Sequence, residues 1–180
     1  MGANLAWIGL GGNLAGSRQA LAAAVGELDG IGQVGPISSL YRSAPRERTD
    51  QPDFLNAALA VATELAPRPL LAELKAIERR LGRDPDGHRY GPRVVDLDLL
   101  VVDGQCLDEG PDLVVPHPRL ADRRFALEPL GELAPDLRPW AACADATMRE
   151  RTVAEALAAV ADQDVETVEG RGWAAVIGSS

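Results

Sequence analysis

Two aspartates stand one residue apart inside a markedly apolar stretch of the chain. Asp96 and Asp98 interrupt a run of Val and Leu over residues 94–102. Because side chains alternate between the faces of a β-strand, a strand here places both carboxylates on one face and Leu97 and Leu99 in the core. Buried carboxylates need a counter-charge, and Mg²⁺ binds one or two carboxylates together with phosphate oxygens. The pair predicts a site for two Mg²⁺ ions, unless the strand is a solvated edge with two ordinary surface aspartates.

Basic and titratable side chains gather in the two segments that flank this strand. They are Arg83, His88, Arg89 and Arg93 before it, and His117, Arg119, Arg123 and Arg124 after it. Arginines that hold phosphates, next to carboxylates that hold Mg²⁺, are typical of phosphoryl transfer, in which charge is stabilised rather than handled covalently. Surface arginines paired with neighbouring aspartates would explain the same residues equally well.

Aromatic side chains are scarce, and both phenylalanines lie beside predicted loops. Phe54 and Phe125 could sandwich a planar heterocycle by offset stacking, and the amide of Asn56 offers it a donor and an acceptor. Taken singly, each Phe is more often a core residue. The three Trp residues are interpreted as packing residues.

The hydrophobic pattern predicts the elements that must position these residues. Strands are expected over 5–10, 37–43, 54–65 and 94–102, and helices over 17–28, 70–81, within 119–133 and over 153–160. Polar loops are expected over 44–53 and 83–92. The order β-α-β-β-α-β predicts an α+β ferredoxin-like open sandwich with a mainly antiparallel sheet and helices packed on it. Residues 1–140 form the predicted domain, and 141–180 a C-terminal extension packed on or appended to the same domain. The tail from Gln163 onward either adds a short strand over 173–177 or is loosely held.

Composition restricts the possible partners. The 180 residues carry 18 Lys+Arg against 27 Asp+Glu, a net charge of −9, which argues against a nucleic-acid surface. A small anionic ligand needs only a local basic cluster. The apolar stretches are too short to span a membrane, and no signal-peptide pattern is found. A cytoplasmic monomer that binds small molecules is the expectation.

The glycine-rich start and the two cysteines match no known site. The segment from Gly11 to Ser17 lacks the Lys of a P-loop, and the dinucleotide fingerprint lacks its third Gly. Cys106 and Cys143 lie far apart with no second cysteine at ligand spacing. Neither a disulfide nor a structural zinc site is expected, in keeping with a reducing cytosol.

Several motifs resemble the 6-hydroxymethyl-7,8-dihydropterin pyrophosphokinase family over residues 5–140. They occur in the family's order at the family's spacing: GGNL at 11–14, YRSAP at 41–45, DQPDFLN at 50–56, ERRLGR at 78–83, GPRVVDLD at 91–98, PH at 116–117, and Arg123 with Phe125. Several positions depart from the family pattern. Ser43 replaces the usual Thr, Arg46 stands where an apolar residue is common, and Phe54 stands where Tyr often occurs. Two more departures lie in the second loop. Tyr90 stands where Trp is usual, and Pro85 stands where a second Arg is usual. These two changes affect the residues on which loop closure and ATP affinity depend in the family, and they leave the metal site unchanged.

The resemblance implies that a pyrophosphoryl group passes from ATP, the co-substrate, to the hydroxymethyl oxygen of the pterin, with AMP leaving, in folate biosynthesis. It implies that Asp96 and Asp98 hold two Mg²⁺ ions and act in catalysis with Arg83 and Arg93. Asp98 is the candidate general base. The implied ATP contacts are Glu78, Tyr90, Arg93, Leu99, His117 and Arg123. The implied pterin contacts are Ser43, Ala44, Pro45, Phe54, Asn56, Asp96 and Phe125.

Two other functions stay open. The Asp-x-Asp strand also resembles that of polymerase-β-like nucleotidyltransferases, although their motif closely follows a Gly-Gly or Gly-Ser turn and Gly12 lies far upstream of Asp96. A nucleotide-binding or pterin-binding module without catalytic activity is the second alternative. The presence of Asp96, Asp98, Arg83 and Arg93 argues against it.

Overall fold

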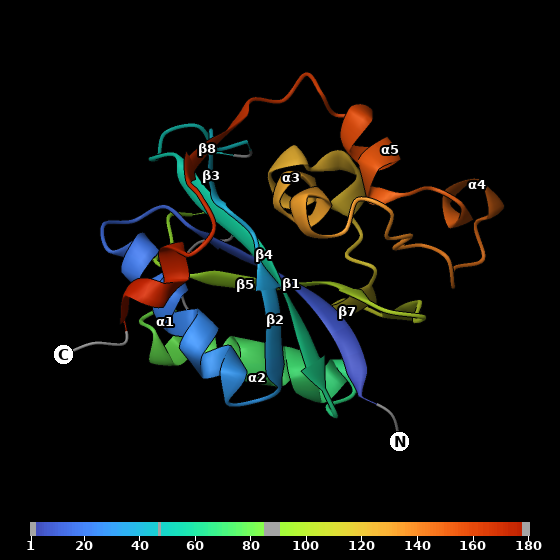
Figure 1. Cartoon of the computed structure of the whole chain (residues 1–180), viewed down its shortest axis with the longest axis horizontal. Helices are drawn as coiled ribbons and strands as arrows, with labels where there is room; N and C mark the ends of the chain where they lie inside the picture. The colour runs from blue at the N-terminus through green and yellow to red at the C-terminus, as the bar shows by residue number, and fades with distance from the viewer. Residues whose placement is uncertain (1–2, 47, 85–90, 178–180) are drawn as a thin grey trace.

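The computed structural model describes residues 3–46, 48–84 and 91–177, and these build an antiparallel sheet with helices on both faces (Figure 1). The six-stranded sheet has the order β5-β1-β4-β3-β8, with β2 also paired to β4. Its strands are β1 (Asn4–Gly12), β2 (Gln33–Ile37), β3 (Leu40–Ser43), β4 (Phe54–Thr63), β5 (Asp96–Val102) and β8 (Val165–Glu169). A separate hairpin joins β6 (Leu107–Glu109) to β7 (Leu113–Val115). The predicted α+β open sandwich is confirmed.

Two helical layers cover the sheet. On one face lie α1 (Ser17–Asp29) and α2 (Pro67–Arg80), and on the other α3 (Arg124–Leu133) and α5 (Val153–Ala158) (Figure 1). Short helices η1 (Leu120–Asp122), α4 (Ala146–Arg149) and η2 (Trp173–Ile177) complete the elements. Alternate residues of β4 divide between the two cores, as the sequence predicts: Leu59 and Val61 pack with α1 and α2, and Ala58 and Ala60 pack with α3 and α5.

Two predicted strands differ from the observed ones. The stretch 37–43 divides between β2 and β3, and Ser38 between them bonds to β4 through both its N–H and its hydroxyl. Residues 173–177 form the 3₁₀ helix η2 instead of a strand, because Trp173 turns inward, is 3% exposed, and donates its indole N–H to the Ser38 carbonyl. The strand of this segment is β8, which pairs with β3.

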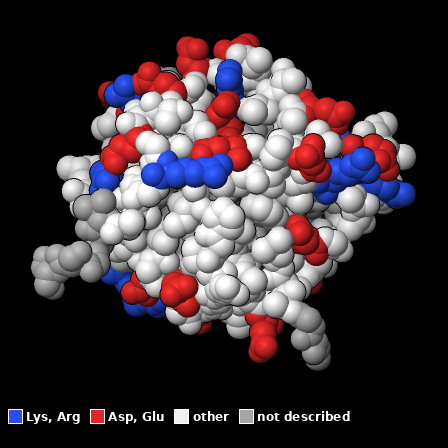
Figure 2. Space-filling view, viewed as in Figure 1, with Lys and Arg blue, Asp and Glu red and all other residues white. Residues whose placement is uncertain are grey.

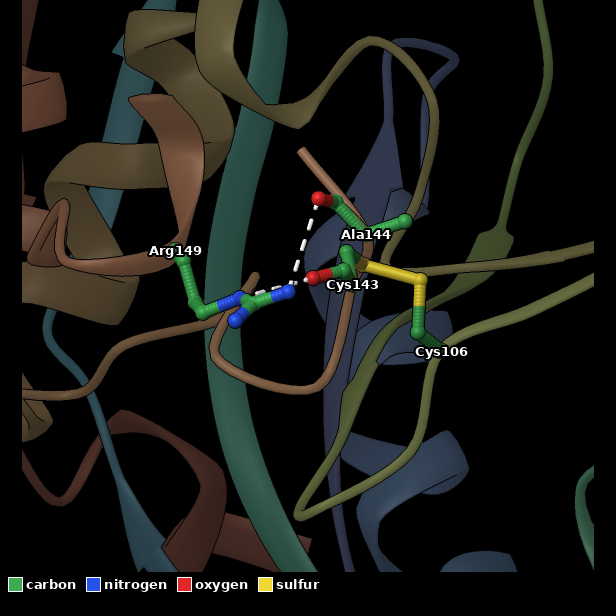
Figure 3. The surroundings of a disulfide bond; sticks show 4 residues. All are labelled: Cys106, Cys143, Ala144 and Arg149. Carbon is green, nitrogen blue, oxygen red and sulfur yellow. Dashed lines mark hydrogen bonds between the residues drawn. A yellow bond between two sulfur atoms is a disulfide. The ribbon is translucent and has the colours of Figure 1, made fainter. Parts of the chain in front are cut away.

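The expectation of unpaired cysteines is wrong. Cys106, just before β6, forms a disulfide with Cys143, and 37 residues separate them (Figure 3). After α3 the chain returns past the β6–β7 hairpin, so residues distant in sequence meet. The guanidinium of Arg149 donates to the carbonyls of Cys143 and Ala144 and holds this turn. Sequence spacing carries no information on such a long-range approach.

Candidate active site

A cavity of about 760 Å³ opens where β1, β4 and β5 meet the loops around residues 44–53 and 91–94 and the start of α3. This volume lies in the range of small-molecule sites. The cavity collects most of the side chains that the sequence singles out: Ser43, Ala44, Pro45, Phe54, Asn56, Arg83, Arg93, Asp96, Asp98, His117, Arg123 and Phe125. Among residues 3–46, 48–84 and 91–177, none of the helices has the length and apolar composition needed to cross a bilayer.

Two predicted site residues, Leu99 and Glu78, are placed differently, and a third is not described. Leu99 packs in the core on the opposite face of β5, and Leu100 lines the cavity instead. Glu78 is 2% exposed and lies behind the cavity wall. Tyr90 lies outside the described residues, as do Pro85, His88 and Arg89.

Asp96 and Asp98 lie on the same face of β5, as the strand period predicts. In the neighbouring strand β1, Gly11 is paired with Asp96 and Gly9 with Asp98. Both glycines line the cavity, so no side chain of β1 covers the two carboxylates. Both carboxylates are thus accessible to a ligand from the same side of the sheet, at the bottom of the cavity.

The two carboxylates are balanced differently. Asp96 pairs with Arg83 Nη1 through Oδ1 at 2.5 Å and with Arg93 Nη1 through Oδ2 at 2.8 Å. Burial would raise the pKa of Asp96, but Arg93 and Arg83 hold that pKa below its ordinary value. For Asp98, burial and the neighbouring Asp96 charge raise the pKa to about 6. Asp98 is therefore the carboxylate that gains most from an added cation.

Glu78 fastens α2 to β5 beside the aspartates. Its Oε1 accepts the N–H of Leu97 at 2.6 Å, and its carboxylate pairs with Lys75 at 2.7 Å and with Arg83 at 2.6 Å. Glu78 thereby sets the position of two cations that do line the cavity.

Lys75 is a cavity residue that the sequence reasoning missed. Its ammonium donates to the Leu97 carbonyl at 3.0 Å and to Glu78, and its side chain lines the cavity with Asp96 and Asp98. A signal was available, because Lys75 is the only lysine of a chain whose other cationic side chains are arginines.

His117 lines the same cavity as the aspartates, and hydrogen bonds hold its backbone and its ring. Its backbone N–H donates to the Leu100 carbonyl, and its Nδ1 accepts the backbone N–H of Arg119 at 3.2 Å. Burial, together with Arg123 and Arg119, lowers the pKa of His117 to about 4. At neutral pH the imidazole is therefore uncharged, with Nε2 as its N–H donor.

Three elements supply the remaining wall. Asn56 on β4 is buried, and its amide nitrogen donates to the Ser43 hydroxyl at 3.0 Å and to the Phe54 carbonyl at 3.2 Å. Asn56 is paired with Gly11, so Asn56 and Asp96 flank that glycine from both sides. The guanidinium of Arg123 lies over the aromatic ring of Phe125 on α3, 5.4 Å from the centroid of that ring.

The residues fit Mg²⁺ that arrives with phosphate. No cluster of three or more His, Cys, Asp or Glu with the arrangement of a metal site occurs over residues 3–46, 48–84 and 91–177. Asp96 and Asp98 supply two carboxylates, and Mg²⁺ commonly takes its remaining ligands from water and substrate phosphates. The donor set matches a metal–nucleotide complex better than a metal site made by protein alone.

Comparison with known families decides the identity of this arrangement. The model of the 7,8-dihydro-6-hydroxymethylpterin-pyrophosphokinase (HPPK) family matches residues 7–135. The chain belongs to this family. All residues that line the cavity fall within the HPPK match, from Gly9 to Ala126.

Relatives agree over most of their length. The 2-amino-4-hydroxy-6-hydroxymethyldihydropteridine pyrophosphokinase of Methylorubrum extorquens is 41% identical over 167 residues, covering 91% of this chain and 98% of that one. The enzyme of the same name from Pseudomonas aeruginosa is 44% identical over 134 residues, covering 73% and 82%. The crystal structure of wild-type Plasmodium falciparum HPPK-DHPS gives a TM-score of 0.65 at 13% identity, over 87% of this chain and 44% of that longer chain. That last likeness concerns the fold.

Proposed function

We propose that this chain performs its HPPK reaction in the cavity between β1, β5 and α3. The enzyme is an ATP-dependent pyrophosphokinase of folate biosynthesis, which transfers pyrophosphate from ATP to 6-hydroxymethyl-7,8-dihydropterin and forms AMP. The observation that carries the proposal is the complete inclusion of the cavity lining in the family match. The residue roles below rest on the geometry of that lining.

The pterin is assigned to the wall formed by Phe54, Asn56 and Phe125. Two aromatic rings can stack on the faces of a planar heterocycle, each contact contributing about 0.5–1.5 kcal/mol. The amide of Asn56, oriented by Ser43, and the backbone of Ala44 and Pro45 supply polar contacts to its edge. These residues lie on β3, directly after β3, on β4 and on α3, so a pterin bound here would bridge the sheet and the helical layer.

The triphosphate is assigned to the cationic side of the cavity. Lys75, Arg83, Arg93, Arg123 and the Nε2–H of His117 can donate to phosphate oxygens. Glu78 acts from behind this wall by orienting Lys75 and Arg83. Leu99 packs in the core and does not line the cavity, so its contact with ATP stays a prediction, as does that of Tyr90.

Asp96 and Asp98 would hold the two Mg²⁺ ions. When bound, Mg²⁺ neutralises charge on the transferred phosphate and on both the attacking and the leaving oxygen. Arg83 and Arg93 already meet at Asp96 and can shift to phosphate oxygens as these enter. The protein then contributes mainly position and charge: the hydroxymethyl oxygen is held in line with the β-phosphorus and AMP leaves. Asp98 is our candidate acceptor for the hydroxyl proton.

Loops that border the cavity serve to exclude water. Water competes with the alcohol for phosphorus, so the loop over 44–53 and the segment beginning at Arg83 have to close on the substrates. Asn13 links the first loop to Arg93: its side-chain Nδ2 donates to Gln51 Oε1 and to the Pro52 carbonyl, and its side-chain Oδ1 accepts the backbone N–H of Arg93.

The chain is further proposed to act as a cytoplasmic monomer on small molecules, without nucleic acid or membrane. On the face drawn in Figure 2, acidic side chains are spread widely, and basic ones stand in small groups beside them. This pattern offers no broad cationic surface there to a polyanion. The Cys106–Cys143 disulfide means that unpaired cysteines no longer support a cytoplasmic location. That location is proposed only because the chain belongs to a family of folate-biosynthesis enzymes.

Product analysis tests the proposal. Purified protein is mixed with ATP, Mg²⁺ and 6-hydroxymethyl-7,8-dihydropterin, and the nucleotides are separated by chromatography. AMP that forms only with pterin present is the expected result. ADP would mean transfer of a single phosphoryl group, and absence of turnover with pterin still bound would mean a binding module.

A further inference from the structure

Residues beyond the segment matched by the HPPK family model reach the rim of the cavity. Gln163 lies between α5 and β8 and is half-buried. The chain is fixed on both sides of it: α5 packs on α3, and Val165 two residues later is paired with Ser43 at the end of β3. Since Ser43 lines the cavity, β8 carries Gln163 to the edge of the proposed pterin wall.

The side chain of Gln163 joins two walls that no element of the sheet connects directly. Its Oε1 accepts the Arg46 guanidinium at 3.0 Å and the backbone N–H of Arg124 at 3.0 Å. Its Nε2 donates to the Asp122 carbonyl at 3.0 Å. Arg46 Nη1 also donates to the Asp122 carbonyl, at 2.6 Å. Arg46, Asp122 and Gln163 thus form one network, which we call the rim latch.

Both ends of the rim latch adjoin proposed pterin contacts. Arg46 follows Pro45 in the loop over 44–53. Asp122 and Arg124 flank Arg123 where η1 passes into α3, and Phe125 directly follows Arg124. Arg46 and Asp122 themselves line the cavity. The separation of the two walls determines the width of the aromatic slot, so a contact that joins them sets where a planar substrate can lie.

We propose that Gln163 is a positioning residue for the pterin, which acts by holding the loop over 44–53 against the start of α3. This inference rests on the proposed function, because it assumes that the slot between Phe54 and Phe125 takes the pterin. Three of the proposed triphosphate contacts, Lys75, Arg83 and Arg93, are attached to α2 and β5 and lie outside the rim latch. Arg123 is the proposed triphosphate contact that adjoins the latch, because it stands between Asp122 and Arg124. Loss of the latch should therefore affect the two substrates unequally.

Steady-state kinetics of Gln163→Ala tests the inference. We expect the KM for 6-hydroxymethyl-7,8-dihydropterin to rise about tenfold, because several hydrogen bonds that include a charged donor are lost, while the KM for ATP changes less than about twofold. Gln105→Ala is the matched control. It removes the same side chain from a half-buried position, where Gln105 donates to Asn4 Oδ1 away from the cavity. Its kinetics should equal those of the wild type.

Two more variants separate positioning from simple stabilisation. Gln163→Glu keeps the size and the pairing with Arg46 but turns the donor toward Asp122 into an acceptor, so an intermediate rise in pterin KM is expected. In the double variant with Arg46→Ala, the effects on pterin KM should be non-additive, because both residues act in one network. If Gln163→Ala does not fold, Arg46→Ala alone must show the selective rise in pterin KM.

Wild-type turnover distinguishes the failure of this inference from failure of the function. Wild-type protein that makes no AMP refutes the function itself. If the wild type is active, three results would overturn the rim latch: unchanged kinetics in Gln163→Ala, equal increases in KM for both substrates, or a lower Tm with both KM values unchanged.

Discussion

Asp96 and Asp98 show how one strand face can carry two carboxylates with opposite electrostatic situations. Asp96 is neutralised by Arg83 and Arg93, whereas the pKa of Asp98 is raised to about 6 by burial and by Asp96. A carboxyl whose pKa is raised by folding keeps its proton better in the folded state, so above about pH 6 its ionised form opposes folding. Asp98 is therefore expected to favour activity at the expense of stability.

Asp98→Asn should show both effects. We expect turnover to fall by about 100-fold or more, because a charge placed at the phosphates is lost. In the absence of Mg²⁺ and nucleotide, the free energy of unfolding at pH 8 should equal or exceed that of the wild type. Activity assays and urea unfolding provide the measurements, with the exposed Asp112→Asn as control. Wild-type activity would refute the role of Asp98, and a marked loss of stability would refute its electrostatic cost.

His117 gives a pH dependence of opposite sign. Its pKa is lowered to about 4 in the folded chain, against the ordinary value of 6.5. As the pH falls from 6.5 toward 4, the unfolded state binds a proton that the folded state does not, so His117 removes stability over this window. In His117→Gln this part of the loss should disappear. The free energies of unfolding are measured at pH 7, 6, 5 and 4. The difference between variant and wild type should shift in favour of the variant as the pH falls, and a difference that does not change with pH would contradict the lowered pKa of His117.

The end of β1 depends on two neighbouring glycines for different reasons. A Cβ on Gly12 would come within 2.4 Å of the Val94 carbonyl and 2.8 Å of the Ser17 hydroxyl. The backbone of Gly12 therefore packs closely against the Val94 backbone and the Ser17 side chain, where β1, α1 and the segment entering β5 converge. A Cβ on Gly11 meets only ordinary contacts, at 3.9 Å from Asn56 Oδ1 and from Asp96 Cβ. Gly12 supports the strand arrangement, and Gly11 keeps the cavity floor open.

Alanine at these two positions should separate stability from binding. Gly12→Ala is expected to lower the free energy of unfolding by about 1–3 kcal/mol, the usual cost of overpacking. Gly11→Ala should leave stability near the wild-type value and raise the pterin KM, because its methyl group lies between Asn56 and Asp96. Chemical denaturation and steady-state kinetics measure the two effects. Equal stabilities of the two variants would show that the strand can shift at Gly12.

In the molecule as a whole, the segment after α3 is tied back to the rest of the fold at several points. Disulfide Cys106–Cys143 joins it to the β6 hairpin, β8 extends the sheet beside β3, and Trp173 enters the core formed by α1 and α2. Arg18 adds ion pairs to Glu169 and a hydrogen bond to the Trp173 carbonyl. The segment after residue 140 therefore shares a sheet and a core with the residues before it.

Removal of the disulfide should destabilise the chain measurably. Closing a loop between residues 37 apart restricts the unfolded chain, which corresponds to roughly 2–4 kcal/mol of stability. We expect Cys143→Ser, or wild type with reducing agent, to lose stability of this order in urea unfolding. The double variant Cys106→Ser/Cys143→Ser should match the single one. Reducing agent should leave the double variant unchanged, and an equal response of both proteins would show that the bond does not stabilise the fold.

Local sequence determined the main elements and the contents of the site. The alternation of apolar residues over 54–65 and 94–102 is enough to define β4 and β5 and to put Asp96 and Asp98 on one face, because strand geometry is local. The motif residues on β3, β4 and β5, in the segment before β5 and at the start of α3 then identified most of the cavity wall, including Asn56, Arg93 and Phe125.

Tertiary structure decided everything that depends on which segments meet. The Cys106–Cys143 bond, the inward turn of Trp173, and the contact of Gln163 with Arg46 join residues far apart in sequence. The packing of α2 on β5 also places Glu78 behind the cavity wall and Lys75 in the cavity lining, although both residues lie on the same turn of α2. Sequence periodicity defines the face of a helix or strand. It carries no information about which distant groups will balance the charges on that face, and those groups decide which residues meet the substrate.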